Sequence, residues 1–117
     1  MSTYSTEKKY MIAVDAMGGD NAPEEIIKGA LLAIESNEME IILVGDEDKM
    51  SNYLPANLPS NLHCVYSHGV VNEDEQPLEA SKSKPKASVF VCADLVKDGQ
   101  ADAFVTMGST GAAMAAG

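Results

Sequence analysis

The chain has 117 residues, 45% of them hydrophobic and 22% charged, which is the composition of an ordinary globular protein with one compact core. Its 18 acidic and 8 basic side chains give a formal charge of −10 at pH 7. A charge of that sign repels the backbone of nucleic acids, so we exclude nucleic acid from the expected partners.

The two cysteines, Cys64 and Cys92, are too few for a disulfide framework and fit no zinc spacing, so we expect reduced, mostly buried thiols. The N-terminal segment, residues 1–9, is polar and is expected to be a disordered tail. The apolar run after it is interrupted at Asp15, so it lacks the long apolar region of a signal peptide or a membrane span. We therefore expect a cytoplasmic protein.

Residues 10–15, YMIAVD, are predicted to form the first strand, because short apolar runs bounded by Gly or Asp are typical of strands. A helix is predicted after the loop DAMGGDN. Asn21 is its expected N-cap, Glu24 lies three residues later as in a capping box, and Pro23 stands in the first turn. The apolar stripe expected to face the core consists of Ile26, Ile27, Ala30, Leu31 and Ile34.

The same criteria predict strands at residues 39–46, 62–69 and 101–108, and helices at residues 47–53 and 88–98. Prolines in PANLPSN end the first of these helices, and a glycine follows the second, as is typical. The acidic stretch NEDEQPLEASKSKPK has weak periodicity. Strands that alternate with helices indicate an α/β fold with a mostly parallel sheet between helical layers.

In such sheets ligands bind beyond the carboxyl ends of the strands. The turn Gly108-Ser109-Thr110-Gly111 falls there, and its glycines, hydroxyls and helix-start N–H groups suit a phosphate or a developing oxyanion. A turn in which Ser109 or Thr110 only caps the helix is equally compatible with the spacing. Neither the Walker motif nor the dinucleotide motif is matched, so a kinase or a nicotinamide enzyme is disfavoured.

The loop DAMGGDN places Asp15 at the end of a strand and Asp20 beside a helix start, with the flexible pair Gly18 and Gly19 between them. Carboxylates so placed are able to orient a substrate, accept a proton or hold a divalent cation. For Asp20, a favourable charge at a helix N-terminus is the preferred interpretation. Asp15 closes a buried strand, and a buried carboxylate requires polar partners or a functional role.

The remaining polar candidates give weaker signals. His68 is expected at the carboxyl edge of the sheet and His63 near the opposite edge, and neither has a partner for a catalytic triad, so ordinary surface or loop histidines are favoured. The basic run of Lys82, Lys84 and Lys86 is usually a solvated loop, and it is equally able to dock an acidic partner or guide an anion.

Two stretches, IAVDAMGGDNAPEEIIKGALLAI and LVKDGQADAFVTMGSTGAAMA, closely resemble the N-terminal third of the bacterial phosphate acyltransferases of phospholipid synthesis. IILVGDEDKM and VVNEDEQPLEA match between them, so the resemblance covers nearly the whole chain from residue 10 onward. It implies a fold similar to those of phosphotransacetylases and isopropylmalate dehydrogenases. Residues 10–117 are then expected to be the N-terminal part of a single catalytic domain that is truncated here.

The resemblance implies an enzyme that transfers a long-chain acyl group from acyl carrier protein to inorganic phosphate, forming an acyl phosphate, without an organic cofactor. It also implies a homodimer that associates peripherally with the membrane. Two alternatives stay open: a phosphate acetyl- or butyryltransferase acting on acyl-coenzyme A, and a non-catalytic phosphate-binding fragment. The isolated 117-residue chain is expected to be inactive, because missing strands would leave one sheet edge unpaired.

Both lines of reasoning lead to one site hypothesis. Phosphate is expected at the turn Gly108 to Gly111, held by backbone N–H groups and the hydroxyls of Ser109 and Thr110, where the protein supplies positioning and oxyanion stabilisation. Thr110 and Asp15 are the expected catalytic residues. Four loop residues are expected to form the adjacent wall of the substrate site: Gly18, Gly19, Asp20 and Asn21. No metal site is predicted.

The chain departs from the family pattern in three places. Ser109 stands where the family usually has Asn, which keeps a hydrogen-bonding group but shortens its reach. Thr106 and Met107 replace a usual Ser-Ala pair. Pro85 is inserted among the lysines of the family's basic segment, the segment otherwise expected to dock the carrier protein.

Overall fold

The computed structural model describes residues 9–71 and 76–107. All but the last residue of the predicted N-terminal tail, and the whole of the turn Gly108 to Gly111, lie outside these ranges. Along the described chain the elements are β1 (Tyr10–Asp15), α2 (Glu24–Ala33), the 3-10 turn η1 (Ile34–Ser36), β2 (Met39–Gly45), α3 (Glu47–Ser51), β3 (Leu62–Tyr66), α4 (Pro77–Ser83), α5 (Ser88–Lys97) and β4 (Ala103–Val105).

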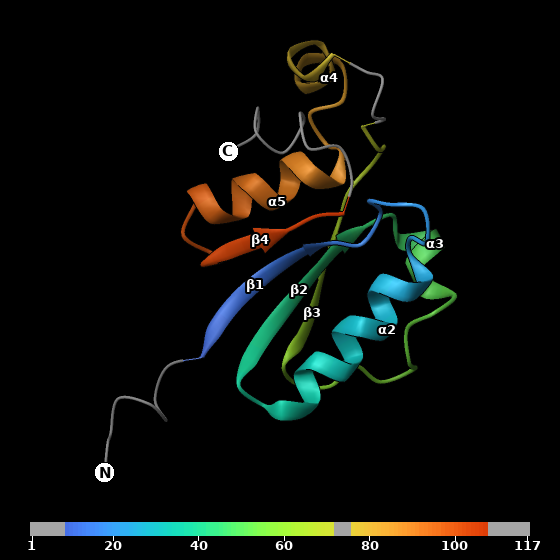
Figure 1. Ribbon diagram of the computed structural model, residues 1–117, viewed down its shortest axis with the longest axis vertical. Coiled ribbons are helices and arrows are strands. Elements are labelled where there is room, and N and C mark those ends of the chain that lie inside the picture. The colour runs from blue at the N-terminus through green and yellow to red at the C-terminus, as the bar shows by residue number, and fades with distance from the viewer. Residues whose placement is uncertain (1–8, 72–75, 108–117) are drawn as a thin grey trace.

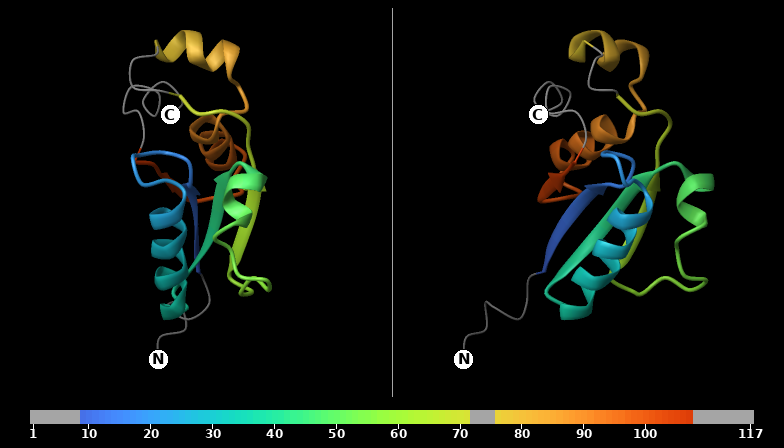
Figure 2. Two further views of the ribbon diagram at one scale, coloured as in Figure 1. Left: turned by 90° about the vertical axis from the view of Figure 1, so that its right-hand side faces the viewer. Right: turned by 45° about the vertical axis from the view of Figure 1, so that its right-hand side comes forward.

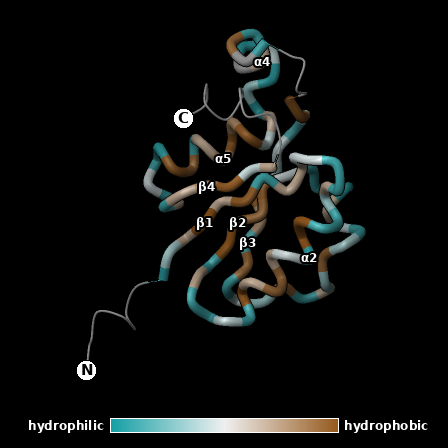
Figure 3. The backbone as a smooth tube through the Cα atoms, viewed as in Figure 1, coloured by the Kyte–Doolittle hydropathy of each residue, from teal (hydrophilic) through white to brown (hydrophobic). Residues whose placement is uncertain are grey.

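The strands form one sheet in the order β3-β2-β1-β4, and every pairing in this part of the chain is parallel (Figure 1). The register pairs Val14 of β1 with Leu43 of β2 and with Val105 of β4. Apolar residues gather in the central strands (Figure 3), as expected for strands buried on both faces. The predicted parallel α/β fold is therefore confirmed.

Helices cover both faces of the sheet, which gives the three layers (Figure 2). On one face Ile27 and Ala30 of α2 pack with Leu43 of β2 in a buried cluster. On the other face Cys92 and Leu95 of α5 pack against the sheet in a second cluster. The predicted apolar stripe of α2 is confirmed, because its members are buried in the first cluster or packed against it: Ile26, Ile27, Ala30, Leu31 and Ile34.

The start of α2 differs from the expected capping box. The helix begins at Glu24 with Pro23 as its N-cap, and no side chain caps it. Asn21 therefore lies too far ahead of the first helical turn for its side chain to act as the cap. Its main-chain carbonyl instead accepts a 3.1 Å hydrogen bond from the N–H of Glu25. The predicted role of Asn21 as N-cap is wrong.

Other boundaries are shorter than expected, and one helix is new. The third and fourth strands end at Tyr66 and Val105, before the glycines that were expected to close them. α4 forms within the acidic stretch, for which the weak periodicity predicted no helix or strand. The helix after residue 87 ends as predicted, with Gly99 at a positive φ of 78° just beyond it.

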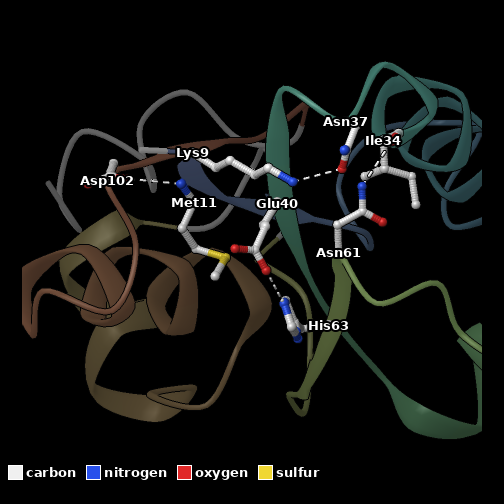
Figure 4. Close-up of polar contacts among 8 residues, drawn as sticks. All are labelled: Lys9, Met11, Ile34, Asn37, Glu40, Asn61, His63 and Asp102. Carbon is white, nitrogen blue, oxygen red and sulfur yellow. Dashed lines mark hydrogen bonds and ion pairs between the residues drawn. The ribbon is translucent and has the colours of Figure 1, made fainter. Parts of the chain in front are cut away.

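Polar contacts fasten the amino edge of the sheet (Figure 4). The N–H of Met11 donates to the carboxylate of Asp102 at 2.8 Å, and the N–H of Asp102 donates to the carbonyl of Met11 at 2.7 Å. Lys9 donates to the side-chain oxygen of Asn37 at 2.8 Å. The two bonds with Asp102 fix the start of β1 against the segment that leads into β4, and the bond of Lys9 links it to the turn before β2.

Two further contacts of this edge involve β2 and β3. The side-chain amide of Asn61 donates to the carbonyl of Ile34 at 2.9 Å, which holds the loop before β3 against the end of α2 (Figure 4). His63 contacts Glu40 at 2.8 Å in an exposed pair between the two strands. His63 thus lies at the edge opposite the candidate site, on the surface, as expected from the sequence.

Candidate functional site

The strand order reverses between β1 and β4. From β1 the chain runs to β2 and β3 on one side, and α5 then brings it back to place β4 on the other side of β1. Such a reversal in a parallel sheet opens a crevice beyond the carboxyl ends of the two strands, where ligands of this fold class bind. The crevice between β1 and β4 is therefore the place to look for function.

A buried carboxylate links the two strand ends at this point. Asp15, the last residue of β1, is 3% exposed. One of its oxygens accepts a 2.7 Å hydrogen bond from the hydroxyl of Thr106, the first residue after β4. The other accepts a 3.0 Å bond from the N–H of Met17 in the following loop. The expectation that Asp15 needs partners is met, and the partners are the loop and the end of β4.

The loop after β1 packs closely against the segment that follows β4. Gly19 has a φ of +94°, which side-chain-bearing residues rarely adopt, and a Cβ at this position would lie 3.1 Å from the Cβ of Met107. Gly18 is buried, whereas Asp20 and Asn21 are exposed. The structure thus brings Asp15, Gly18 and Gly19 to one place with the residues that precede the predicted phosphate turn.

A cleft of about 560 Å³ opens beside this loop, between α2 and the face of β1 and β4. The end of the cleft at the carboxyl edge of the sheet, called its upper end, is formed by the loop from Gly18 to Asn21 together with Thr106 and Met107. Its lower part is apolar and runs between the sheet and α2 toward Ala33 and Met39. The four predicted wall residues therefore all line one cleft.

The charges around the cleft are negative. Among the described residues that line it, the ionisable ones are Asp15, Asp20 and Glu25, and none is basic. Glu25 also lies 3.8 Å from Lys28 on the outer side of α2, in an exposed pair. Any cation that would assist an anionic ligand must therefore come from outside this lining.

Cys92 of α5 is buried in the cluster that contains Ala13 of β1, near enough to Asp15 to be affected by its charge. Burial raises the pKa of the Cys92 thiol far above its usual range, and the negative charge of Asp15 raises that pKa further. Burial also raises the pKa of Cys64 on β3. Both cysteines are free thiols, as expected, although Cys64 is only partly buried. A thiol held protonated is a poor nucleophile, so Cys92 acts as a packing residue.

The other polar candidates lie apart from the cleft. His68 is exposed at the carboxyl edge, and its N–H donates to the carbonyl of Lys86 at 2.8 Å. The ammonium group of Lys84 donates to the carbonyl of Val70 at 3.0 Å, which leaves Lys82 and Lys86 as the exposed lysines of the predicted basic run. Ser67 is buried with no partner for its hydroxyl among the residues that the structure describes.

Thr106 is a site residue that sequence reasoning missed. It was noted only as a departure from the family pattern, yet it is the hydroxyl partner of Asp15 across 91 residues of sequence. A polar residue directly after a short apolar strand, at the carboxyl edge of a parallel sheet, was the available signal. Ser109, Thr110 and their flanking glycines follow it and lie outside the described residues.

The chain matches the model of one protein family, described as fatty acid synthesis protein, over residues 10–117. The chain belongs to this family. It is 49% identical over 106 residues to the phosphate acyltransferase of Desulfitobacterium hafniense and 50% identical to that of a Cyanothece species, in each case over 90% of this chain. The match to the phosphate acyltransferase of Thermosynechococcus vestitus reaches 52% identity.

The shared region is a limited part of those relatives. This family member spans 32% of the length of the Desulfitobacterium protein and 31% of the Cyanothece and Thermosynechococcus proteins. Within residues 9–71 and 76–107, none of the helices is both long and apolar enough to cross a membrane.

Proposed function

We propose that this segment forms part of an enzyme that transfers a long-chain acyl group from acyl carrier protein to inorganic phosphate, producing an acyl phosphate for phospholipid synthesis. The proposal rests on sequence identity: 90% of this chain aligns with proteins named phosphate acyltransferase at 49% and 50% identity. The loop and cleft at the β1–β4 strand reversal support it, because they offer a substrate site where this fold class has one.

In this proposal phosphate binds at the turn Gly108 to Gly111. A phosphate oxygen attacks the thioester carbonyl, the tetrahedral oxyanion collapses, and the carrier-protein thiolate leaves and takes up a proton. Backbone N–H groups of the turn and the hydroxyl of Thr110 hold the phosphate and the oxyanion. Ser109 supplies a second hydroxyl.

Asp15 acts in this proposal by positioning. It is buried and both of its oxygens already accept hydrogen bonds, from Met17 and from Thr106. Thr106 stands two residues before Gly108. We therefore propose that the Asp15–Thr106 bond positions the start of the phosphate turn. The packing of Gly19 on Met107 helps to hold the same segment of chain. Asp20 and Asn21 form the exposed rim of the substrate cleft.

The proposal extends to the assembly. In line with the family resemblance, the full-length enzyme works in the cytoplasm as a homodimer that touches the membrane surface, where its product is used. It requires no organic cofactor. The exposed Lys82 and Lys86 are among the positive groups beside the carboxyl edge, together with Lys49 of α3, and they are proposed to meet an acidic carrier protein.

The test uses a chain of the relatives' full length that carries these 117 residues, called here the full-length chain. It is given hexadecanoyl-acyl carrier protein with and without phosphate, and the release of free thiol is measured. We expect release that requires phosphate. Acetyl-coenzyme A serves as the competing donor: turnover of it alone would assign the chain to short-chain acetyl or butyryl transfer, and turnover of neither would contradict acyl transfer to phosphate.

A further inference from the structure

We propose that the cleft between α2 and strands β1 and β4 binds the acyl chain of the substrate, with the reacting carbonyl at the loop Gly18 to Asn21 and the tail running toward Ala33 and Met39. The inference rests on the proposed function and adds to it the place of the acyl group. Gly29 is the residue that sets how much of the acyl chain fits in the cleft.

The lining changes from polar to apolar along the cleft. The polar groups are at the upper end, next to Thr106 and the loop after β1. Below them the sheet contributes Ile12, Val14 and Val105, and Val105 is 50% exposed. Opposite them α2 contributes Glu25 in its first turn, and after it only apolar or small residues: Ile26, Gly29, Ala30 and Ala33. One continuous cleft with a polar head and an apolar stem suits a ligand built in the same way.

The dimensions fit an acyl chain. A volume of about 560 Å³ falls inside the range of roughly 300–1,000 Å³ that is usual for small-molecule sites. The stretch of α2 that lines the cleft, from Glu25 to Ala33, rises about 12 Å at 1.5 Å per residue. Each methylene group removed from water in such a cleft improves binding by roughly fourfold.

The charges favour the uncharged tail over the phosphate as the occupant. The ionisable groups among the described lining residues are Asp15, Asp20 and Glu25, and they would repel an anion from the rim. Phosphate is therefore assigned to the proposed turn that begins at Gly108, two residues after Thr106 in the sequence, and not to this cleft. A neutral hydrocarbon chain enters the apolar stem without an electrostatic penalty.

Gly29 gives the most specific sign that this space is kept open. It lies inside α2, where glycine is less favourable than alanine. It has no positive φ, and a Cβ built on it would meet no atom within 4 Å among the described residues. Neither backbone conformation nor close packing there calls for a glycine, and it lines the cleft. A larger side chain at this position would project into the stem.

The experiment replaces Gly29 in the full-length chain and compares donors of two lengths. Gly29→Leu and the milder Gly29→Ala are assayed with hexadecanoyl- and hexanoyl-acyl carrier protein. Lys28→Leu is the matched control, because it places the same leucine side chain at the preceding position of α2, outside the cleft lining. We expect Gly29→Leu to lower kcat/KM for the long donor about fifteenfold, the equivalent of losing two methylene contacts, and for the short donor less than about twofold.

Equal losses for both donors would overturn the proposal. So would a fall in the melting temperature of Gly29→Ala, because it would mean that another part of the protein fills the stem. A second readout needs no turnover: the uncharged methyl ester of hexadecanoic acid, with a diazirine at its far end, is photo-crosslinked to the full-length chain, and the labelled peptides are identified. Label on residues 24–39 that disappears in Gly29→Leu supports binding of the acyl chain in the cleft, even if acyl transfer to phosphate is not observed. Label elsewhere contradicts it.

Discussion

The carboxylate of Asp15 accepts a 2.7 Å hydrogen bond from the hydroxyl of Thr106, and this bond joins the carboxyl ends of β1 and β4 across 91 residues of sequence. Asp15 is also bonded to the N–H of Met17, so strand, loop and neighbouring strand meet at one buried group. The strand order of the sheet reverses at the same place. The structural support of the proposed site is therefore concentrated in Asp15 and its two partners.

Loss of the Asp15 carboxylate is expected to destabilise the protein. Asp15→Ala removes the two hydrogen bonds that the carboxylate accepts, from the Thr106 hydroxyl and from the Met17 N–H, which costs about 1–3 kcal/mol of unfolding free energy. Asp15→Asn is the control, since its side-chain oxygen still accepts from Met17 and the threonine hydroxyl is able to accept from the amide. Urea denaturation of the full-length variants measures both. Equal stability of Asp15→Ala and the wild type would show that the two bonds contribute nothing.

Gly19 and Gly29 are expected to respond in opposite directions to the same change. Gly19→Ala forces a side chain into a φ of +94° and within 3.1 Å of the Met107 Cβ, so we expect a loss of about 1–2 kcal/mol. Gly29→Ala places a better helix former in open space and should add about 0.5–1 kcal/mol. Melting temperatures of the two variants decide the matter. A stabilised Gly19→Ala would contradict the packing of the loop on the segment that follows β4.

The stability of the protein should fall at high pH because of Cys92. Burial raises the pKa of its thiol, and the charge of Asp15 raises it further. The folded protein therefore keeps a proton that the unfolded chain loses near pH 8.5. The stabilisation is thus complete below about pH 8.5 and is lost as the pH rises from there toward the raised folded pKa. Urea midpoints at pH 7.5 and 9.5 should differ more in the wild type than in Cys92→Ala. An equal shift of the urea midpoint between the two pH values in the wild type and in Cys92→Ala would show that Cys92 does not cause the pH dependence.

The isolated 117-residue chain is expected to show no acyl transfer. It spans about a third of the length of the relatives that it matches, and Val105 and Met107 at the β4 edge are 50% and 71% exposed. Among the described residues β4 is an edge strand, and we expect the further residues of the relatives to pair with this edge and complete the crevice. Thiol release per mole by the 117-residue chain and by the full-length chain is compared under the same conditions. Equal turnover would mean that these residues hold a complete site.

Local patterns predicted most of the fold. The apolar runs located the strands, the stripe of α2 was correct, and Gly99 marked the end of α5 through its positive φ. A buried Asp15 could be expected to need partners. These features depend on neighbouring residues or on burial alone, so one sequence is enough to reveal them.

Features that depend on distant contacts could not be predicted. Thr106 became the partner of Asp15 only because the chain crosses from β3 to the far side of β1 before it forms β4. The Asn21 cap failed because the helix begins later, at Glu24. The cleft beside Gly29 is likewise a product of how α2 lies on the sheet, which no local pattern encodes.

The most direct test of the site is phosphate saturation in the full-length chain with Thr106→Val and Thr106→Ser. Valine removes the hydroxyl that bonds to Asp15 and keeps the shape, whereas serine keeps the hydroxyl. Because this bond is proposed to position the turn at Gly108, we expect valine to raise the KM for phosphate about tenfold or more, the equivalent of one lost hydrogen bond to a charged group. Serine should stay close to the wild type. An unchanged KM for phosphate in a folded Thr106→Val variant would contradict the placement of the site between β1 and β4.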